Sequence, residues 1–232
     1  RACNEFGTTK KKLISLQDGA RNITFNAIKD DEIVATQTVP LTIDSKTPKI
    51  TSVNPRRGFV DIFEVNFIEE NPVSVILFYG NSTFTERRNH TLNIDNDCEN
   101  EKNKYNCIVD VDLTDFDGKE IMYQFEVTDV VGKSDFSKDQ DVLVDVSPPI
   151  INELDYNVSG KKVHFNINIT EQNFDEVTYT DIDDKEKILC STLVQGSCDK
   201  TKAFDSGEHN LTITVYDEAG NTALSFIYFF IN

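Results

Sequence analysis

Apolar and polar residues alternate along most of this chain. The segments 63–67, 123–127 and 163–169 each place an apolar side chain at every second position, with Asn, Glu, Gln or His between them. This period of two is typical of a β-strand that buries one face and leaves the other in water. The sequence has no sustained apolar stripe at helical spacing, and β-branched and aromatic residues are plentiful. We therefore predict an all-β protein.

Two kinds of segment recur in the sequence and divide it. The stretch 41–50 runs from a strand through an Asp and a Pro-containing linker into a new strand, and 142–151 repeats this order. A glycine corner followed by an alternating strand occurs three times, at Asp18-Gly19, Asp117-Gly118 and Ser206-Gly207. The repeats predict units at 1–47, 48–147 and 148–232, the last two of the size of a β-sandwich.

The first unit, residues 1–47, holds only the last strands of such a sandwich. Its sheet would expose Ile23, Phe25, Leu41 and Ile43 to water, at a cost of roughly 1.5–3 kcal/mol for each large side chain. We expect this face to be covered, either by residues upstream of the sequence or by strands of a neighbouring molecule.

Several motifs that specify a fold occur together in the last unit. They are the corner Ser206-Gly207, the strand 211–215, the turn Asp217-Glu-Ala-Gly220-Asn221 and the linker 144–149. With them the chain resembles the tandem immunoglobulin-like repeats of bacterial and archaeal cell-surface proteins, such as adhesins, S-layer proteins and surface fibres. The resemblance covers nearly the whole chain and implies tandem immunoglobulin-like β-sandwiches joined by short linkers, without catalytic residues. The first unit departs from the turn pattern, with Lys29-Asp-Asp-Glu32 where Asp-x-x-Gly is expected.

Charge and hydropathy narrow the set of partners. The chain has 23 Lys and Arg against 40 Asp and Glu, a formal net charge of −17, whereas a nucleic-acid surface needs clustered positive charge. The longest apolar stretch, 223–231, is about half of a membrane span. We expect no nucleic-acid partner and no membrane anchor within this segment. Residues 1–20 have no signal-peptide core, so we expect any export signal to lie outside it.

Five cysteines stand at positions 3, 98, 107, 190 and 198. The local pairs Cys98–Cys107 and Cys190–Cys198 flank polar loops that a disulfide can close, whereas zinc needs four ligands at metal spacing. We predict two disulfides and hence an oxidising, extracellular location. Cys3 is left over. Its partner lies either upstream of the sequence or in a second molecule, as an intermolecular disulfide that completes the first unit in a polymer.

Six Asn-x-Ser/Thr sequons occur in the sequence. In several of them the middle residue is apolar, which an alternating strand with an outer face of Asn and Thr would produce without any glycan. Glycosylation nevertheless fits an exported protein, because the same alternation directs these Asn side chains to solvent. The candidates are Asn22, Asn81, Asn89, Asn157, Asn168 and Asn210, with Asn81 and Asn89 favoured because they lie in a polar connecting stretch.

Acidic residues recur at one end of each predicted sandwich, where the incoming linker and two loops meet. Ca²⁺ takes about six to eight oxygen ligands from such loops, so these residues form a candidate calcium site that would stiffen a joint. The alternative is that they are solvated loop carboxylates, with Asp serving as a turn residue. The candidates are Asp44, Glu69, Glu70 and Asp129 in the second unit and Asp145, Glu171, Asp217 and Glu218 in the third.

Motifs that carry catalytic chemistry are missing from the sequence, which holds three His and no nucleophile elbow, zinc-protease motif or phosphate loop. We predict a non-enzymatic structural or adhesive segment of an exported surface protein, such as a fibre, S-layer or adhesin stalk. It would self-assemble or adjoin further domains of the same protein. The alternative is a carbohydrate- or protein-binding module. Outward strand positions are mostly Asn, Thr, Asp and Glu, with Tyr216 a rare aromatic, which favours the structural role.

Overall fold

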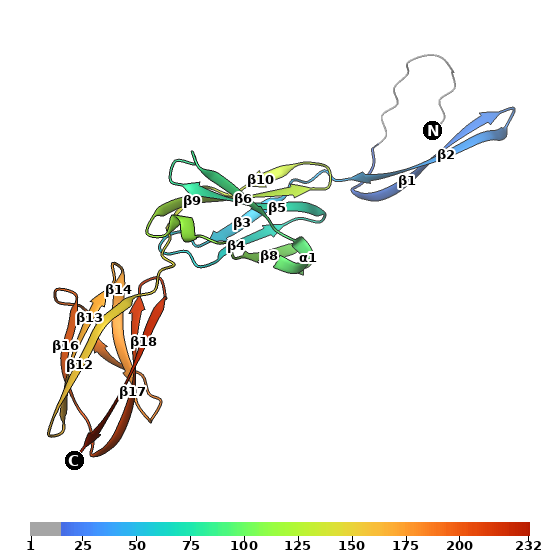
Figure 1. Ribbon diagram of the computed structural model, residues 1–232. Helices are drawn as coiled ribbons and strands as arrows, with labels where there is room; N and C mark the ends of the chain where they lie inside the picture. The colour runs from blue at the N-terminus through green and yellow to red at the C-terminus, as the bar shows by residue number, and fades with distance from the viewer. Residues whose placement is uncertain (1–14) are drawn as a thin grey trace.

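The computed structural model of the protein describes residues 15–232 and consists almost entirely of β-strands (Figure 1). Within these residues the helical segments are one short helix, α1 (Ile94–Asp97), and a 3-10 turn at Thr114–Phe116. The predicted all-β fold is therefore confirmed. No helix in this part of the chain is long and apolar enough to cross a membrane. Cys3, the candidate for an intermolecular disulfide, lies outside the described residues.

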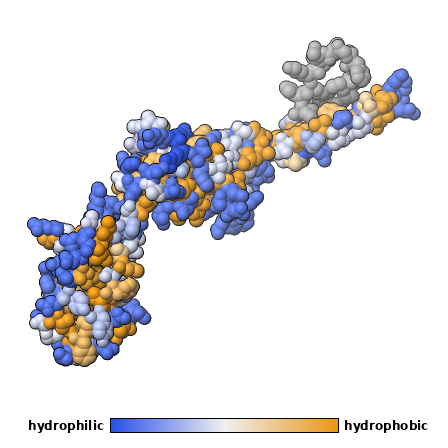
Figure 2. Space-filling view, in the orientation of Figure 1, coloured by the Kyte–Doolittle hydropathy of each residue, from blue (hydrophilic) through white to orange (hydrophobic). Residues whose placement is uncertain are grey.

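The first described unit is a two-stranded antiparallel hairpin of β1 (Gly19–Lys29) and β2 (Glu32–Ile43). Ile23 pairs with Val39, and Phe25 with Gln37. Because no second sheet lies over this face within residues 15–232, Phe25 remains 57% exposed and Val39 40% exposed. Figure 2 shows hydrophobic residues at the surface of this hairpin.

The middle unit is a sandwich of two antiparallel sheets. Its strands are β3 (Lys49–Asn54), β4 (Phe63–Ile68), β5 (Pro72–Asn81), β6 (Arg87–Thr91), β7 (Cys98–Glu101), β8 (Lys104–Val109), β9 (Glu120–Asp129), β10 (Ser134–Phe136) and β11 (Gln140–Leu143). One sheet has the order β3-β4-β8-β7 and the other β10-β9-β5-β6, with β11 also pairing with β9. The ring centroids of Phe63 and Tyr123 lie 4.8 Å apart between the sheets. The alternation in β4 and β9 thus builds the core.

The C-terminal unit is a second sandwich, with its own core. Its strands are β12 (Ile150–Ser159), β13 (Lys162–Thr170), β14 (Phe174–Thr180), β15 (Lys187–Cys190), β16 (Ser197–Ala203), β17 (Gly207–Asp217) and β18 (Thr222–Ile231). The sheets have the orders β12-β13-β16 and β15-β14-β17-β18. Phe165 and Ile167 of β13 and Leu211 and Ile213 of β17 are fully buried between them, as the period of two predicts.

Two disulfides close local loops in different ways. Cys98 and Cys107 are direct cross-strand partners on β7 and β8, so this bond lies within one sheet. Cys190 and Cys198 lie on β15 and β16, which belong to different sheets, so the second bond ties the two layers of the C-terminal sandwich together. Both pairs are those that the sequence predicts.

Candidate metal centre at the joints

A short linker leads into each sandwich. We call residues 44–48, between β2 and β3, joint 1, and residues 145–149, between β11 and β12, joint 2. Each begins with one of the predicted acidic residues, Asp44 or Asp145. Both linkers are held by hydrogen bonds to the unit before them and to the unit after them.

The upstream contact is made by the Asp of the glycine corner. At joint 1, Asp18 accepts hydrogen bonds from the backbone N–H of Ser45 at 3.1 Å and from its hydroxyl at 2.8 Å. At joint 2, Asp117 accepts them from the hydroxyl of Ser147 at 2.5 Å and the N–H of Val146 at 2.9 Å. These hydrogen bonds lower the pKa of the Asp117 carboxyl. The corner Asp therefore holds the linker that leaves its own unit, which is the hairpin at joint 1 and the middle sandwich at joint 2.

The downstream contact is made by an Asn side chain in the loop after the second strand of each sandwich. Asn71 Nδ2 donates to Asp44 Oδ2 at 3.1 Å, and Asn173 Nδ2 donates to Asp145 Oδ2 at 2.6 Å. Hydrogen bonds to a charged acceptor are stronger than neutral ones. With the corner contact, each linker is held from both sides.

Two further carboxylates line each joint. The side chains of Glu69 and Glu171 accept the backbone N–H of the residue two positions later, at 2.8 Å in both cases. Asp129 and Asp217 each end the strand that precedes the last turn, and each accepts the N–H groups two and four positions later. This Asx-turn geometry explains why Asp is needed there even without a metal.

Joint 1 contains a positively charged side chain at its linker. The ammonium group of Lys133 donates to the backbone oxygens of Asp44 at 2.8 Å and Lys46 at 3.1 Å. Asp129 is only 1% exposed, and its Oδ2 has no hydrogen-bond partner. A buried carboxylate oxygen without a donor is costly unless positive charge lies near it. The joint thus presents a buried oxygen that no protein donor satisfies.

Joint 2 has a neutral amide at the same place. Asn221 Nδ2 donates to the backbone oxygen of Asp145 at 3.0 Å and to Asp217 Oδ2 at 2.9 Å. Oxygens of Asp145, Glu171 and Asp217 lie within 4.8 Å of one another. Asp145 is 9% exposed and Asp217 2%. Three carboxylates at this spacing repel one another, and they supply the oxygen ligands that Ca²⁺ prefers.

Six of the eight predicted carboxylates therefore line the joints, and two do not. Glu70 and Glu218 are exposed, and neither side chain belongs to the carboxylate group of joint 2. Sequence reasoning missed the contacts that complete the joints. Those residues are Asp18, Asn71, Asp117, Lys133, Asn173 and Asn221. The signal that could have found them is their matching position in the two repeats.

The six sequons lie on strands, so the expectation that Asn81 and Asn89 lie in a connecting stretch was wrong. All are exposed except Asn81, which is half-buried. Their positions are Asn22 on β1, Asn81 at the end of β5, Asn89 on β6, Asn157 on β12, Asn168 on β13 and Asn210 on β17.

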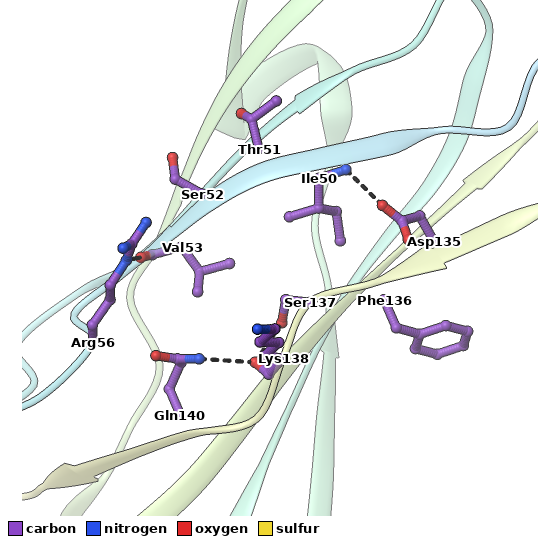
Figure 3. Close-up of a pocket in the computed structure, with 10 residues that line it drawn as sticks. All are labelled: Ile50, Thr51, Ser52, Val53, Arg56, Asp135, Phe136, Ser137, Lys138 and Gln140. Atoms are coloured by element: carbon purple, nitrogen blue, oxygen red, sulfur yellow. Dashed lines mark hydrogen bonds between the residues drawn. The ribbon is translucent and has the colours of Figure 1, made fainter.

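A pocket elsewhere in the middle sandwich offers different chemistry. It lies between β3 and the segment from β10 to β11 (Figure 3). Asp135 Oδ2 accepts the N–H of Ile50 at 2.7 Å, and Gln140 Nε2 donates to the oxygen of Lys138 at 3.1 Å. The first of these bonds links β3 to β10, which belong to different sheets, and the second is local, so we assign the pocket a structural role.

Comparison with known proteins supports this architecture. Residues 144–227, from joint 2 into β18, match the family model of the HYR domain. No curated protein matches the sequence of the chain. Among solved structures, the FN1–FN3 domains of chicken CNTN1 are similar, with 11% identity, 92% of this chain and 77% of that chain covered and a TM-score of 0.51. The fibronectin(III)-like modules of Clostridium thermocellum CbhA reach a TM-score of 0.41 at 10% identity, covering 80% of this chain and 94% of that chain. The fold is thus that of immunoglobulin-like and fibronectin-III-like sandwiches, and the C-terminal sandwich is similar to HYR domains.

Proposed function

We propose that this chain is a structural or adhesive segment of an extracellular surface protein, in which fixed joints keep successive β-sandwiches in line. The observation that carries the proposal is the repeated pair of contacts at each joint. An Asp of the preceding corner and an Asn of the following sandwich hold the same short linker at both joints. Contacts on both sides of a linker restrict the relative motion of the units that it joins.

Two properties of the chain support an extracellular setting. Both disulfides join cysteines close in sequence, and such bonds persist in oxidising compartments. Immunoglobulin-like, fibronectin-III-like and HYR domains are module families without catalytic roles, which fits a non-enzymatic segment. Antibodies against the chain should label intact cells of its source. Labelling only after lysis would contradict a surface location.

We further propose that joint 2 binds Ca²⁺ and that Lys133 replaces the ion at joint 1. The three carboxylates of joint 2 have no cationic side chain among their hydrogen-bond partners in residues 15–232. Their oxygens lie within 4.8 Å of one another, a grouping that does not recur at joint 1 within residues 15–232. A divalent ion would remove the repulsion at joint 2 and bind linker and sandwich together.

The joint proposal is tested by the distance between the two sandwiches. Spin labels placed at Lys138 and Lys200, both exposed, report the distance distribution across joint 2. In the full chain we expect a narrow distribution that broadens in Asn173→Ala, which loses the contact to the linker. Asn157→Ala, an exposed strand substitution, is the matched control and should leave it narrow. A distribution that is already broad in the unaltered chain would refute a fixed joint.

A further inference from the structure

The outer face of β18 carries a row of uncovered aromatic side chains. Phe226 is 69% exposed, Tyr228 57% and Phe230 55%; we call these three residues the aromatic row. The alternate residues Ile227, Phe229 and Ile231 face the core, so β18 is apolar on both faces. This corrects the expectation that outward strand positions are almost all polar. A contiguous apolar strip on a soluble protein indicates that something covers it.

A sequon lies directly across from this row. Asn210 on β17 is the cross-strand partner of Tyr228, and Thr212 is the partner of Phe226. Leu211 between them is fully buried, so Asn210 and Thr212 both point outward, on the same face as the row. Directly paired residues have Cβ atoms about 4.5–5.5 Å apart, and diagonal neighbours are within reach of long groups. Any group attached to Asn210 would therefore meet Tyr228 first.

Two of the other sequons have side chains that already make hydrogen bonds. Asn81 Nδ2 donates to Thr85 Oγ1 at 2.7 Å, and Asn168 Oδ1 accepts from Asn152 Nδ2 at 2.8 Å. For the other exposed sequons the cross-strand partners are Pro40 for Asn22, Phe78 for Asn89 and His164 for Asn157. The Phe78 ring is already covered by the guanidinium of Arg87, 3.8 Å from its centroid. Asn210 is thus the sequon that faces an uncovered aromatic surface.

Carbohydrate suits this surface better than a second copy of the chain. A sugar ring places its C–H face on the face of an aromatic ring and turns its hydroxyls to water, so no charge is buried. Two copies would each bring a formal net charge of −17, which opposes close association. A glycan attached to Asn210 also reaches the row at high effective concentration, because attachment and contact lie on adjacent strands.

We propose that Asn210 is N-glycosylated and that its first sugars lie over Tyr228, between Phe226 and Phe230, and so cover the aromatic row. The donor is a lipid-linked oligosaccharide. Asn210 Nδ2 forms a bond to C1 of the reducing-end sugar, the bond from C1 to the carrier phosphate oxygen breaks, and the phosphate leaves with the electron pair. One amide proton passes to a base of the transferase. This proposal is independent of the joints and of their cation.

The experiment uses the full chain expressed in a host that glycosylates sequons. Peptide mass spectrometry should find Asn210 occupied. The variant Asn210→Gln should then bind more of an apolar fluorescent dye and melt roughly 4–8 °C lower, the shift expected for a modest loss of stability in a domain of this size. Asn157→Gln, which removes a sequon opposite His164, is the matched control and should change neither reading.

A double-mutant cycle tests the contact with the row itself. Tyr228→Thr should lower the melting temperature of the glycosylated chain but have little effect in the Asn210→Gln background. Phe136→Thr, at an exposed aromatic on β10 (51% exposed), should act equally in both backgrounds. An unmodified Asn210 beside an occupied Asn157 would overturn the proposal, and so would additive effects in the cycle. A glycosylated chain that forms a dimer abolished by Tyr228→Thr, or that binds free glycan through the row, would also overturn it.

Discussion

The two joints of this protein share several contacts, but they differ in the spacing of their carboxylates and in one side chain that brings charge to the linker. Each has a linker Asp held by an Asn, a Glu two residues before that Asn, and an Asp that closes the last turn. At joint 1 the residue after this turn is Lys133, whose ammonium group donates hydrogen bonds to backbone oxygens of the linker. At joint 2 it is Asn221, which brings no charge. With the calcium site proposed for joint 2, positive charge would reach one linker from a side chain and the other from a bound ion.

The largest expected effect concerns stabilisation by Ca²⁺. A lysine placed in joint 2 should abolish the rise in melting temperature that Ca²⁺ causes, which we call the calcium response. With Ca²⁺ at about 100 times Kd, a bound ion stabilises the fold by about 2.7 kcal/mol. We expect this gain in the unaltered chain and none in Asn221→Lys, because the ammonium group would occupy the place of the ion. Calorimetric melting in EDTA and in excess Ca²⁺ measures it. Asn157→Lys, with the same charge change away from the joint, should keep the response. Equal calcium responses in all three proteins would refute the site.

The reverse exchange should create a site at joint 1. Lys133→Asn replaces the ammonium group beside Asp44, Glu69 and Asp129 by the amide that joint 2 carries at the matching position, Asn221. Isothermal titration should then find two Ca²⁺ per chain in place of one. Without Ca²⁺ this variant should be less stable, since the backbone oxygens of Asp44 and Lys46 lose the ammonium group that donates to them. Lys138→Asn, a change at an exposed lysine, should still bind one. An unchanged stoichiometry in Lys133→Asn would show that the lysine does not stand in for an ion.

Removing the Asn contact should have a smaller effect, and a different one at each joint. Asn173→Ala leaves Asp145 without its 2.6 Å donor, and we expect a loss of about 1.5 kcal/mol, typical of a hydrogen bond to a charged group. Asn71→Ala should lose less, about 0.5–1 kcal/mol, because Lys133 still holds the Asp44 backbone. Urea unfolding in EDTA measures both. A larger loss at Asn71 would contradict the role assigned to Lys133.

The smallest expected effect concerns pH at the corner of joint 2. The hydrogen bonds from Ser147 and Val146 lower the pKa of Asp117. A group with a lowered folded-state pKa stabilises the fold above its unfolded pKa, which is about 3.9 for Asp, and the contribution disappears as pH falls through the folded value. The amide resonance of Val146 should therefore titrate below about pH 4. In Asp117→Asn this titration should vanish. A titration that persists there would assign it to another group.

Much of the architecture was predictable from sequence because it depends on local rules. The alternation in 63–67 and 163–169 identifies strands and the faces that they bury. The repeat of the linker places Asp44 and Asp145 at equivalent positions, and cysteines only 9 and 8 residues apart indicated their own pairing. The turn residue Asp217 is recognisable because a carboxylate that accepts nearby backbone N–H groups is a local device.

The sequence by itself thus determined the strands, the repeat, the disulfides and the end of each sandwich at which acidic residues gather. Only the tertiary structure decided which side chains meet at the joints. Asn221 reaches the backbone of Asp145 across 76 residues of chain, and Lys133 reaches Asp44 across 89. The tertiary structure also leaves one side of β18 without a covering layer, so that Phe226, Tyr228 and Phe230 are exposed. The physical reason is that periodicity states which side chains share a face of a strand, whereas the packing of distant strands decides whether that face is covered.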